Sequence, residues 1–156
     1  MSNFKFDHKE LDKLKEKFGQ LANGKETDKF YEDCAKEMAA RLLSLVIKKT
    51  PVGVYPKDPS KKGGTLCRGW TGDKTQSAKA FAESLDVKKS GKTYVITIEN
   101  NVEYAPYVEY GHRKRGGKGF VPGQRMLQIS EQELQSIAPK VLQRKMNKFL
   151  KEAFNG

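Results

Sequence analysis

The pattern that most constrains the fold is an apolar stripe at helical spacing between residues 28 and 49. The stripe consists of Phe30, Cys34, Met38, Leu42 and Leu45, which recur at intervals of four and three residues. Thr27 or Asp28 can serve as the N-cap. Thr50-Pro51 should end the helix, because proline disfavours the helical conformation in the residue before it. The sequence therefore predicts a long amphipathic helix that buries one face.

Two further helices are expected on either side of this one. Leu11, Leu14, Phe18 and Leu21 recur at intervals of three and four residues, which predicts a short helix ending near Asn23-Gly24. A last helix should run from about Gly123 to Ala153. Its inward residues would be Leu127, Leu134, Ile137, Val141 and Phe149. Pro139 lies inside this stretch and should kink the helix or mark a new start.

The middle of the chain has the patterns of short strands and loops. Tyr94, Ile96 and Ile98 alternate with Val95, Thr97 and Glu99. This alternation predicts a β-hairpin with one apolar face, formed by 84–88 and 93–100 around Lys89-Ser90-Gly91-Lys92. A short strand is expected at 66–70, and a short helix at 104–110 that Gly111 closes.

The order of these elements indicates an α+β fold. We expect one domain over residues 1–156, with a small antiparallel β-sheet packed against long N- and C-terminal helices. Two loops would interrupt it. The first, at 52–65, is rich in proline and glycine and is expected to be mobile, and the second, at 111–123, is glycine-rich and basic.

The net charge of +11 is concentrated in these loop regions. Residues 48–79 contain eight basic and two acidic residues, and residues 111–125 contain five basic and no acidic residues. The remaining segments sum to zero. A solvated basic surface would explain this distribution, and so would loops that meet an acidic protein or a nucleic acid.

Several function classes find no support in the sequence. No apolar run approaches the ~20 residues of a membrane span, and the N-terminus has no signal core, so we expect no membrane contact and a cytoplasmic origin. Cys34 and Cys67, with His8 and His112, do not have the spacing of a metal site. No nucleotide-binding loop, nucleophile elbow or pair of carboxylates is present. We therefore expect no enzyme activity, cofactor or metal.

Two stretches resemble a known family. The first runs from Asn101 to His112 (NVEYAPYVEYGH) and continues through a basic glycine-rich segment to Phe120-Val121-Pro122-Gly123 and Arg125-Met126-Leu127. The second is Lys49-Thr50-Pro51-Val52 with Leu66 and Gly69-Trp70. Together they resemble the phage head–tail connector and tail-completion family, which includes minor tail and neck proteins of long-tailed phages and of phage-tail-like bacteriocins. The resemblance covers roughly residues 30–150. One departure is the stretch 53–64, where the family commonly has a short turn.

The resemblance implies a non-enzymatic structural subunit that forms a ring, commonly hexameric, at the neck or tail end. Its partners would be other copies, the tail tube or terminator and neck proteins, with contact to DNA in the channel left open. The protein would be found in the host cytoplasm during assembly and then in the particle. The alternative is a basic nucleic-acid-binding module, although no helix is expected to carry a basic stripe.

The residues expected at an interface lie in the central block. They are Tyr107, Tyr110, His112, Arg113, Lys114, Arg115 and Arg125. Tyrosines on a helix this short cannot all be buried, and arginines bind carboxylates or phosphates well. Tyr104 and Val108 are assigned to the core. Acidic groups that could answer the basic residues are Glu32, Asp33 and Glu37, on the expected outer face of the long helix.

Overall fold

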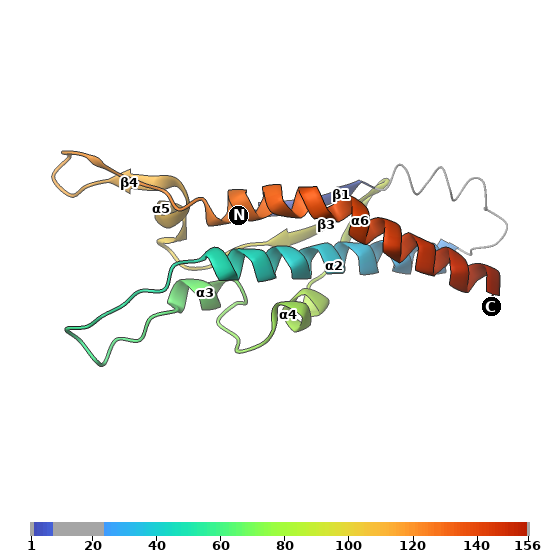
Figure 1. Ribbon diagram of the computed structural model, residues 1–156, viewed down its shortest axis with the longest axis horizontal. Helices are drawn as coiled ribbons and strands as arrows, with labels where there is room; N and C mark the ends of the chain where they lie inside the picture. Colours follow the sequence, from blue (N-terminus) through green and yellow to red (C-terminus); the bar gives the residue numbers. More distant parts are fainter. Residues whose placement is uncertain (1, 8–23, 156) are drawn as a thin grey trace.

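A long central helix, α2, organises the fold. The computed structural model describes residues 2–7 and 24–155 (Figure 1). The elements are β1 (Ser2–Asp7), α2 (Gly24–Lys49), α3 (Thr65–Gly69), α4 (Ala78–Ser84), β2 (Lys88–Ser90), β3 (Thr93–Ile98), α5 (Ala105–Tyr110), β4 (Gly111–Arg113), β5 (Phe120–Pro122) and α6 (Met126–Asn155). The helix expected around 11–21 lies outside the described residues. The α+β class is confirmed.

Helix α2 buries the predicted stripe except for Leu45, which is half-buried against the core, and it begins earlier than expected. Thr27 and Asp28 are inside the helix rather than at its cap. The Asp28 carboxylate is engaged elsewhere, since it accepts hydrogen bonds from the Tyr94 hydroxyl at 2.5 Å and from the Lys89 amine at 3.0 Å. This carboxylate therefore ties the first turns of α2 to the sheet instead of capping the helix.

The main sheet has three antiparallel strands in the order β1-β3-β2. The predicted alternation on β3 is confirmed, because Tyr94, Ile96 and Ile98 are buried. They pack against α2, where the rings of Tyr31 and Tyr94 lie 5.3 Å apart. No strand was predicted at the position of β1. Strand β1 pairs with the whole of β3, from Ser2 opposite Ile98 to Asp7 opposite Thr93.

The segment between α2 and the sheet contains two helices where one strand was expected. The prediction of a strand at 66–70 is wrong, because the Arg68 amide donates to Gly64 O at 3.0 Å and the chain turns as α3. Helix α4 was not predicted. The Ser77 hydroxyl caps it by accepting from the Ala80 amide at 3.1 Å, so the strand expected at 84–88 begins only at Lys88.

Helix α6 runs alongside α2 as one continuous element that includes Pro139. Figure 1 shows its two halves running in different directions. Proline removes one backbone donor, and its position on the exposed side lets water solvate the carbonyl left unpaired one turn earlier. The expected inward residues Leu127, Leu134 and Val141 are buried, and Ile137 is half-buried against the core.

Two adjoining clusters form the core. The larger is built around Met38, Leu42, Ile96, Met126 and Leu134, and the smaller around Phe30, Tyr31, Cys34, Ala35 and Tyr94. Phe149 of α6 stacks on Phe30 with ring centroids 4.5 Å apart. Burial raises the pKa of the Cys34 thiol to about 12, so this cysteine is a core residue. Cys67 is also a free thiol.

Candidate interaction surface at one end of the molecule

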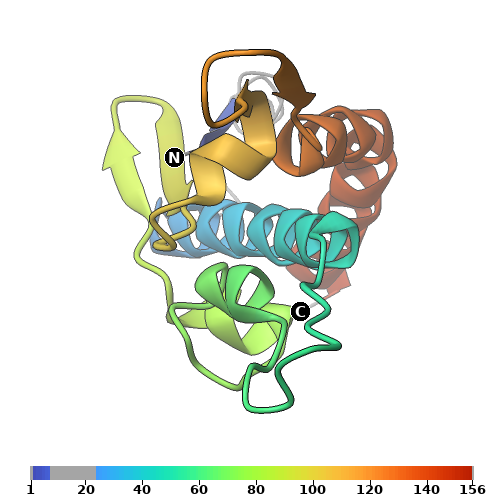
Figure 2. The same cartoon turned by 90° about the vertical axis from the view of Figure 1, so that its left-hand side faces the viewer.

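A loop from the first basic segment and the hairpin of the second project from the same end of the molecule. The loop at 51–64 and the β4–β5 hairpin both extend beyond the end of α2, away from the C-terminus (Figure 1). Figure 2 views this end directly, with the hairpin above the last turns of α2 and the loop below them. We call residues 51–64 and 104–125 together the loop end.

The basic segment at 111–123 is a hairpin rather than only a loop. Its two ends pair as strands, with Gly111 opposite Pro122 and Arg113 opposite Phe120. The Lys114 amide then donates to Gly119 O at 3.0 Å and closes the tip. The expectation of an irregular loop is therefore wrong at the ends of this segment.

Large exposed hydrophobic side chains gather at the same end. Among residues 24–153 they are Val52, Val54, Tyr55, Tyr104, Tyr107, Tyr110, Phe120 and Ile129. All but Ile129 belong to the loop end, and Ile129 lies in the first turn of α6. A concentration of exposed apolar side chains at one end of a molecule favours that end as a binding surface.

The residues expected at an interface all lie at the loop end. Tyr107 and Tyr110 of α5 are 59% and 68% exposed. His112 meets the Tyr107 ring edge-on, with centroids 6.2 Å apart. The basic residues Arg113, Lys114 and Arg115 on the hairpin are exposed. Arg125 lies at the base of the hairpin, where its guanidinium donates to Gln128 Oε1 at 2.7 Å.

The assignment of Tyr104 to the core is wrong. Its side chain is 45% exposed, whereas Val108 is half-buried and packs on the core as expected. The reason is the position of Tyr104 before the first turn of α5, where Ala105 instead turns inward. Tyr104 thus joins Tyr55, Tyr107 and Tyr110 as an exposed tyrosine at the loop end.

A buried carboxylate fixes the base of the hairpin. Glu109 on α5 is only 6% exposed. Its two oxygens accept from the backbone amides of Leu127 at 2.9 Å and Gln128 at 3.0 Å, in the first turn of α6. The N-terminus of a helix has unpaired amides and a positive dipole end, so a carboxylate is a strong cap there. The sequence suggested no role for Glu109.

Backbone contacts strengthen the same junction. The Gln124 amide donates to Val108 O at 2.7 Å, and the Arg125 amide donates to Glu109 O at 3.1 Å. A Cβ on Gly123 would clash with Glu109 O. Gly111 has φ +85°, and a Cβ there would clash with Val121 O. The hairpin therefore leaves the core at a site that admits only glycine at two positions.

The loop at 51–64 has fewer attachments. At its start, the Trp70 indole donates to Thr50 Oγ1 at 2.9 Å, and Thr50 in turn donates to Val46 O at 2.6 Å. The two ends of this loop approach so closely that a Cβ on Gly63 would clash with Gly53 O. At the tip, the Ser60 hydroxyl donates to Asp58 and lowers the pKa of that carboxyl. Val54 remains 81% exposed.

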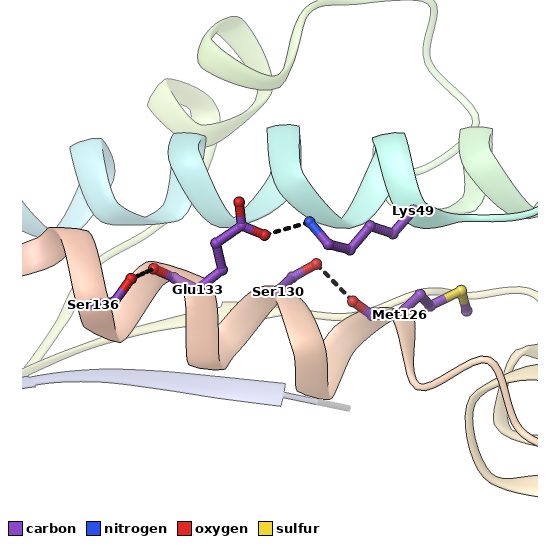
Figure 3. A network of polar contacts seen from close by, with 5 residues as sticks. All are labelled: Lys49, Met126, Ser130, Glu133 and Ser136. Atoms are coloured by element: carbon purple, nitrogen blue, oxygen red, sulfur yellow. Dashed lines mark hydrogen bonds and ion pairs between the residues drawn. The ribbon is translucent and has the colours of Figure 1, made fainter.

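One ion pair among the described residues joins α2, which leads into the loop at 51–64, to α6, which follows the hairpin. The Lys49 amine, in the last turn of α2, lies 2.5 Å from Glu133 Oε2 of α6. Figure 3 shows the two side chains reaching across the gap between the helices. The hydroxyls of Ser130 and Ser136 donate hydrogen bonds to backbone carbonyls within α6, so they do not bridge to α2.

Sequence reasoning missed the apolar members of this surface. Val54, Tyr55 and Phe120 lie among basic and glycine residues, where they were not weighed as contacts. Large apolar residues inside a predicted polar loop are the signal that could have found them, because such a loop offers no core to bury them.

Within the described residues, neither a metal-holding cluster nor a membrane-spanning helix is found. No group of three His, Cys, Asp or Glu side chains in residues 2–7 and 24–155 is close enough to hold a metal ion. No helix in those ranges is both long and apolar enough to cross a membrane.

Comparison with known proteins gives one match. The model of the HK97 gp10-like family, described as "Bacteriophage HK97-gp10, putative tail-component", matches residues 12–111. Neither a curated protein nor a solved structure matches the chain significantly. The family match covers α2, the sheet strands after it and α5, and it ends where the hairpin begins.

Proposed function

Because the chain belongs to the HK97 gp10-like family of phage tail components, we propose that it is a non-enzymatic subunit of a ring at the neck or tail end. The ring would complete the tail or join it to the head, and it would hold six copies if it follows the sixfold symmetry implied by the resemblance. The subunit would be made in the host cytoplasm and end in the virion or tail-like particle.

The observation that carries this proposal is the composition of the loop end. It combines exposed tyrosines with the arginines of the hairpin, as in Tyr107, Tyr110, Arg113 and Arg115. Aromatic residues and arginine are the side chains enriched at protein–protein interfaces, where lysine and small polar residues are depleted. This mixture of side chains is more typical of a surface that contacts another protein than of a surface that faces only solvent.

A neighbouring copy offers a matching surface. Glu32 and Asp33 are exposed on the first half of α2, whereas Glu37 accepts from Arg41 at 2.8 Å and is already paired within the chain. Figure 1 shows that α2 begins at the end of the molecule opposite the loop end. The basic and acidic surfaces cannot meet within one copy, but they can meet between copies. A contact between two different patches repeats head to tail, and it forms a ring when the rotation between neighbouring copies closes.

The test reverses the charge of the hairpin. R113E/R115E should leave the subunit folded, because both side chains are exposed, but it should prevent incorporation into particles. The matched control is K74E/K79E, which changes the same charge at exposed positions outside the loop end. Circular dichroism checks the fold, and electron microscopy of particles from complemented cells scores incorporation. Normal incorporation of R113E/R115E would show that the hairpin is only a solvated surface.

A further inference from the structure

The second half of α6 exposes a basic stripe. Its solvent-facing residues are Pro139, Lys140, Gln143, Arg144, Asn147, Lys148, Lys151 and Glu152. Four of these are basic, namely Lys140, Arg144, Lys148 and Lys151, and we call them the α6 stripe. Their spacing of four, four and three residues places them on one side of the helix. This corrects the expectation that no helix carries a basic stripe.

Acidic side chains lie close to one member of the α6 stripe, Lys148. Lys148 lies 4.0 Å from Glu152 and borders a groove that Glu26 and Asp33 also line. Arg144 Nε donates to Lys140 O at 3.5 Å, which orients the guanidinium along the helix. Among the described residues, Lys140, Arg144 and Lys151 form no ion pair. Three strong cations therefore face solvent, and Lys148 contributes less.

This face differs in chemistry from the loop end. None of the exposed large hydrophobic residues that the structure describes lies on it. The residues between the basic ones include the amides of Gln143 and Asn147, which are also hydrogen-bond donors. Protein–protein contacts need apolar anchors, whereas surfaces that bind nucleic acid are more polar and more positive and use Lys, Arg, Asn and Gln on phosphates.

We propose that the α6 stripe binds the phosphate backbone of duplex DNA without reading its sequence. From Lys140 to Lys151 the helix rises by about 16 Å. A duplex presents roughly ten phosphate charges over that length, so all four cations can be engaged at once. This inference goes beyond the proposed function and does not depend on it, because the α6 stripe is available on a single copy.

The test measures DNA binding by the full-length protein as a function of salt. Fluorescence anisotropy would follow two labelled duplexes of equal length and unrelated sequence, with K140Q/R144Q/K148Q/K151Q as the variant. Both duplexes should bind wild type equally, and the variant should bind at least about tenfold more weakly at low salt. The salt dependence of the binding constant should lose a log–log slope of up to about 3.6, which corresponds to four phosphate contacts.

The matched control is K74Q/K79Q/K88Q/K92Q, which removes the same charge at exposed positions elsewhere. It should change the affinity by less than about threefold, since only long-range attraction is lost. Circular dichroism confirms that both variants fold. Equal weakening by the two variants would contradict the proposal, because binding would then follow net charge alone. The proposal would also be contradicted if the wild-type protein bound polyglutamate more tightly than DNA through the α6 stripe, because the partner would then be an acidic protein.

Discussion

The two arms of the loop end differ in how they are held. The β4–β5 hairpin rises from a junction with a buried carboxylate, two backbone hydrogen bonds between α5 and the start of α6, and two glycines in close backbone contact. The loop at 51–64 is attached mainly through Thr50 and Trp70, and its own hydrogen bonds are local turns. The base of the hairpin is thus fixed to the core, whereas the loop at 51–64 is attached only near its ends.

This difference suggests that the two arms would contribute differently to the proposed interface. A firmly held hairpin can present Arg113 and Arg115 in a fixed direction with little loss of entropy on binding. A tethered loop can adapt Val54 and Tyr55 to the neighbour, at an entropic cost that weakens binding. The hairpin would then determine which neighbour is bound, and the loop would add contact area.

The largest expected effect comes from the cap beneath the hairpin. E109A removes the acceptor for one buried and one partly buried amide, and hydrogen bonds to a charged group contribute about 1.5–3 kcal/mol each. The free energy of unfolding should fall by about 3 kcal/mol in urea titrations. E103A, at an exposed neighbouring position, should change it by less than about 0.5 kcal/mol. Similar values for the two variants would mean that Glu109 does not anchor the hairpin.

An intermediate effect should separate the two arms directly. Alanine at Gly123 forces a Cβ against Glu109 O inside the packed junction, and overpacking of this kind costs about 1–3 kcal/mol. Alanine at Gly63 makes a similar clash with Gly53 O, but the loop can open to relieve it. Thermal unfolding should therefore show a clear loss for G123A and a change below about 1 kcal/mol for G63A. A larger loss for G63A would reverse the comparison of the two arms.

The smallest free energies should appear in hydrogen exchange. Amides of residues 53–64 should exchange rapidly in the free subunit, because local opening of a tethered loop costs close to nothing. The amides of Leu127 and Gln128 should be protected. In assembled particles the loop should become protected as well. Strong protection of 53–64 in an isolated subunit would contradict the tethered-loop description.

Much of the fold follows from local periodicity. The stripe from Phe30 to Leu42 gives α2, the alternation around Ile96 gives β3, and Gly111 ends α5 as expected. Strand β1 could not be read in this way, because its pairing with β3 joins residues far apart in the chain. Helices α3 and α4 are too short to show a helical period in the sequence, so they can be recognised only from their backbone hydrogen bonds.

The loop end was only partly predictable for a related reason. Charge and glycine content predicted both basic segments, and the short helix predicted at 104–110 indicated that some of its tyrosines are exposed. That the segments share one end depends on the path of the chain around α2, which no local pattern contains (Figure 2). The role of Glu109 depends on α5 meeting the start of α6, and the α6 stripe depends on which side of that helix faces solvent.

We propose that the hairpin of one copy meets the first half of α2 in the next copy. A charge-swap experiment tests it most directly. R113E/R115E and E32R/D33R should each abolish incorporation into particles, and the variant carrying all four changes should restore it, because the pairing is re-formed with the signs exchanged. Electron microscopy of particles gives the result, with circular dichroism to confirm folding. Failure of the folded fourfold variant to incorporate would contradict this pairing.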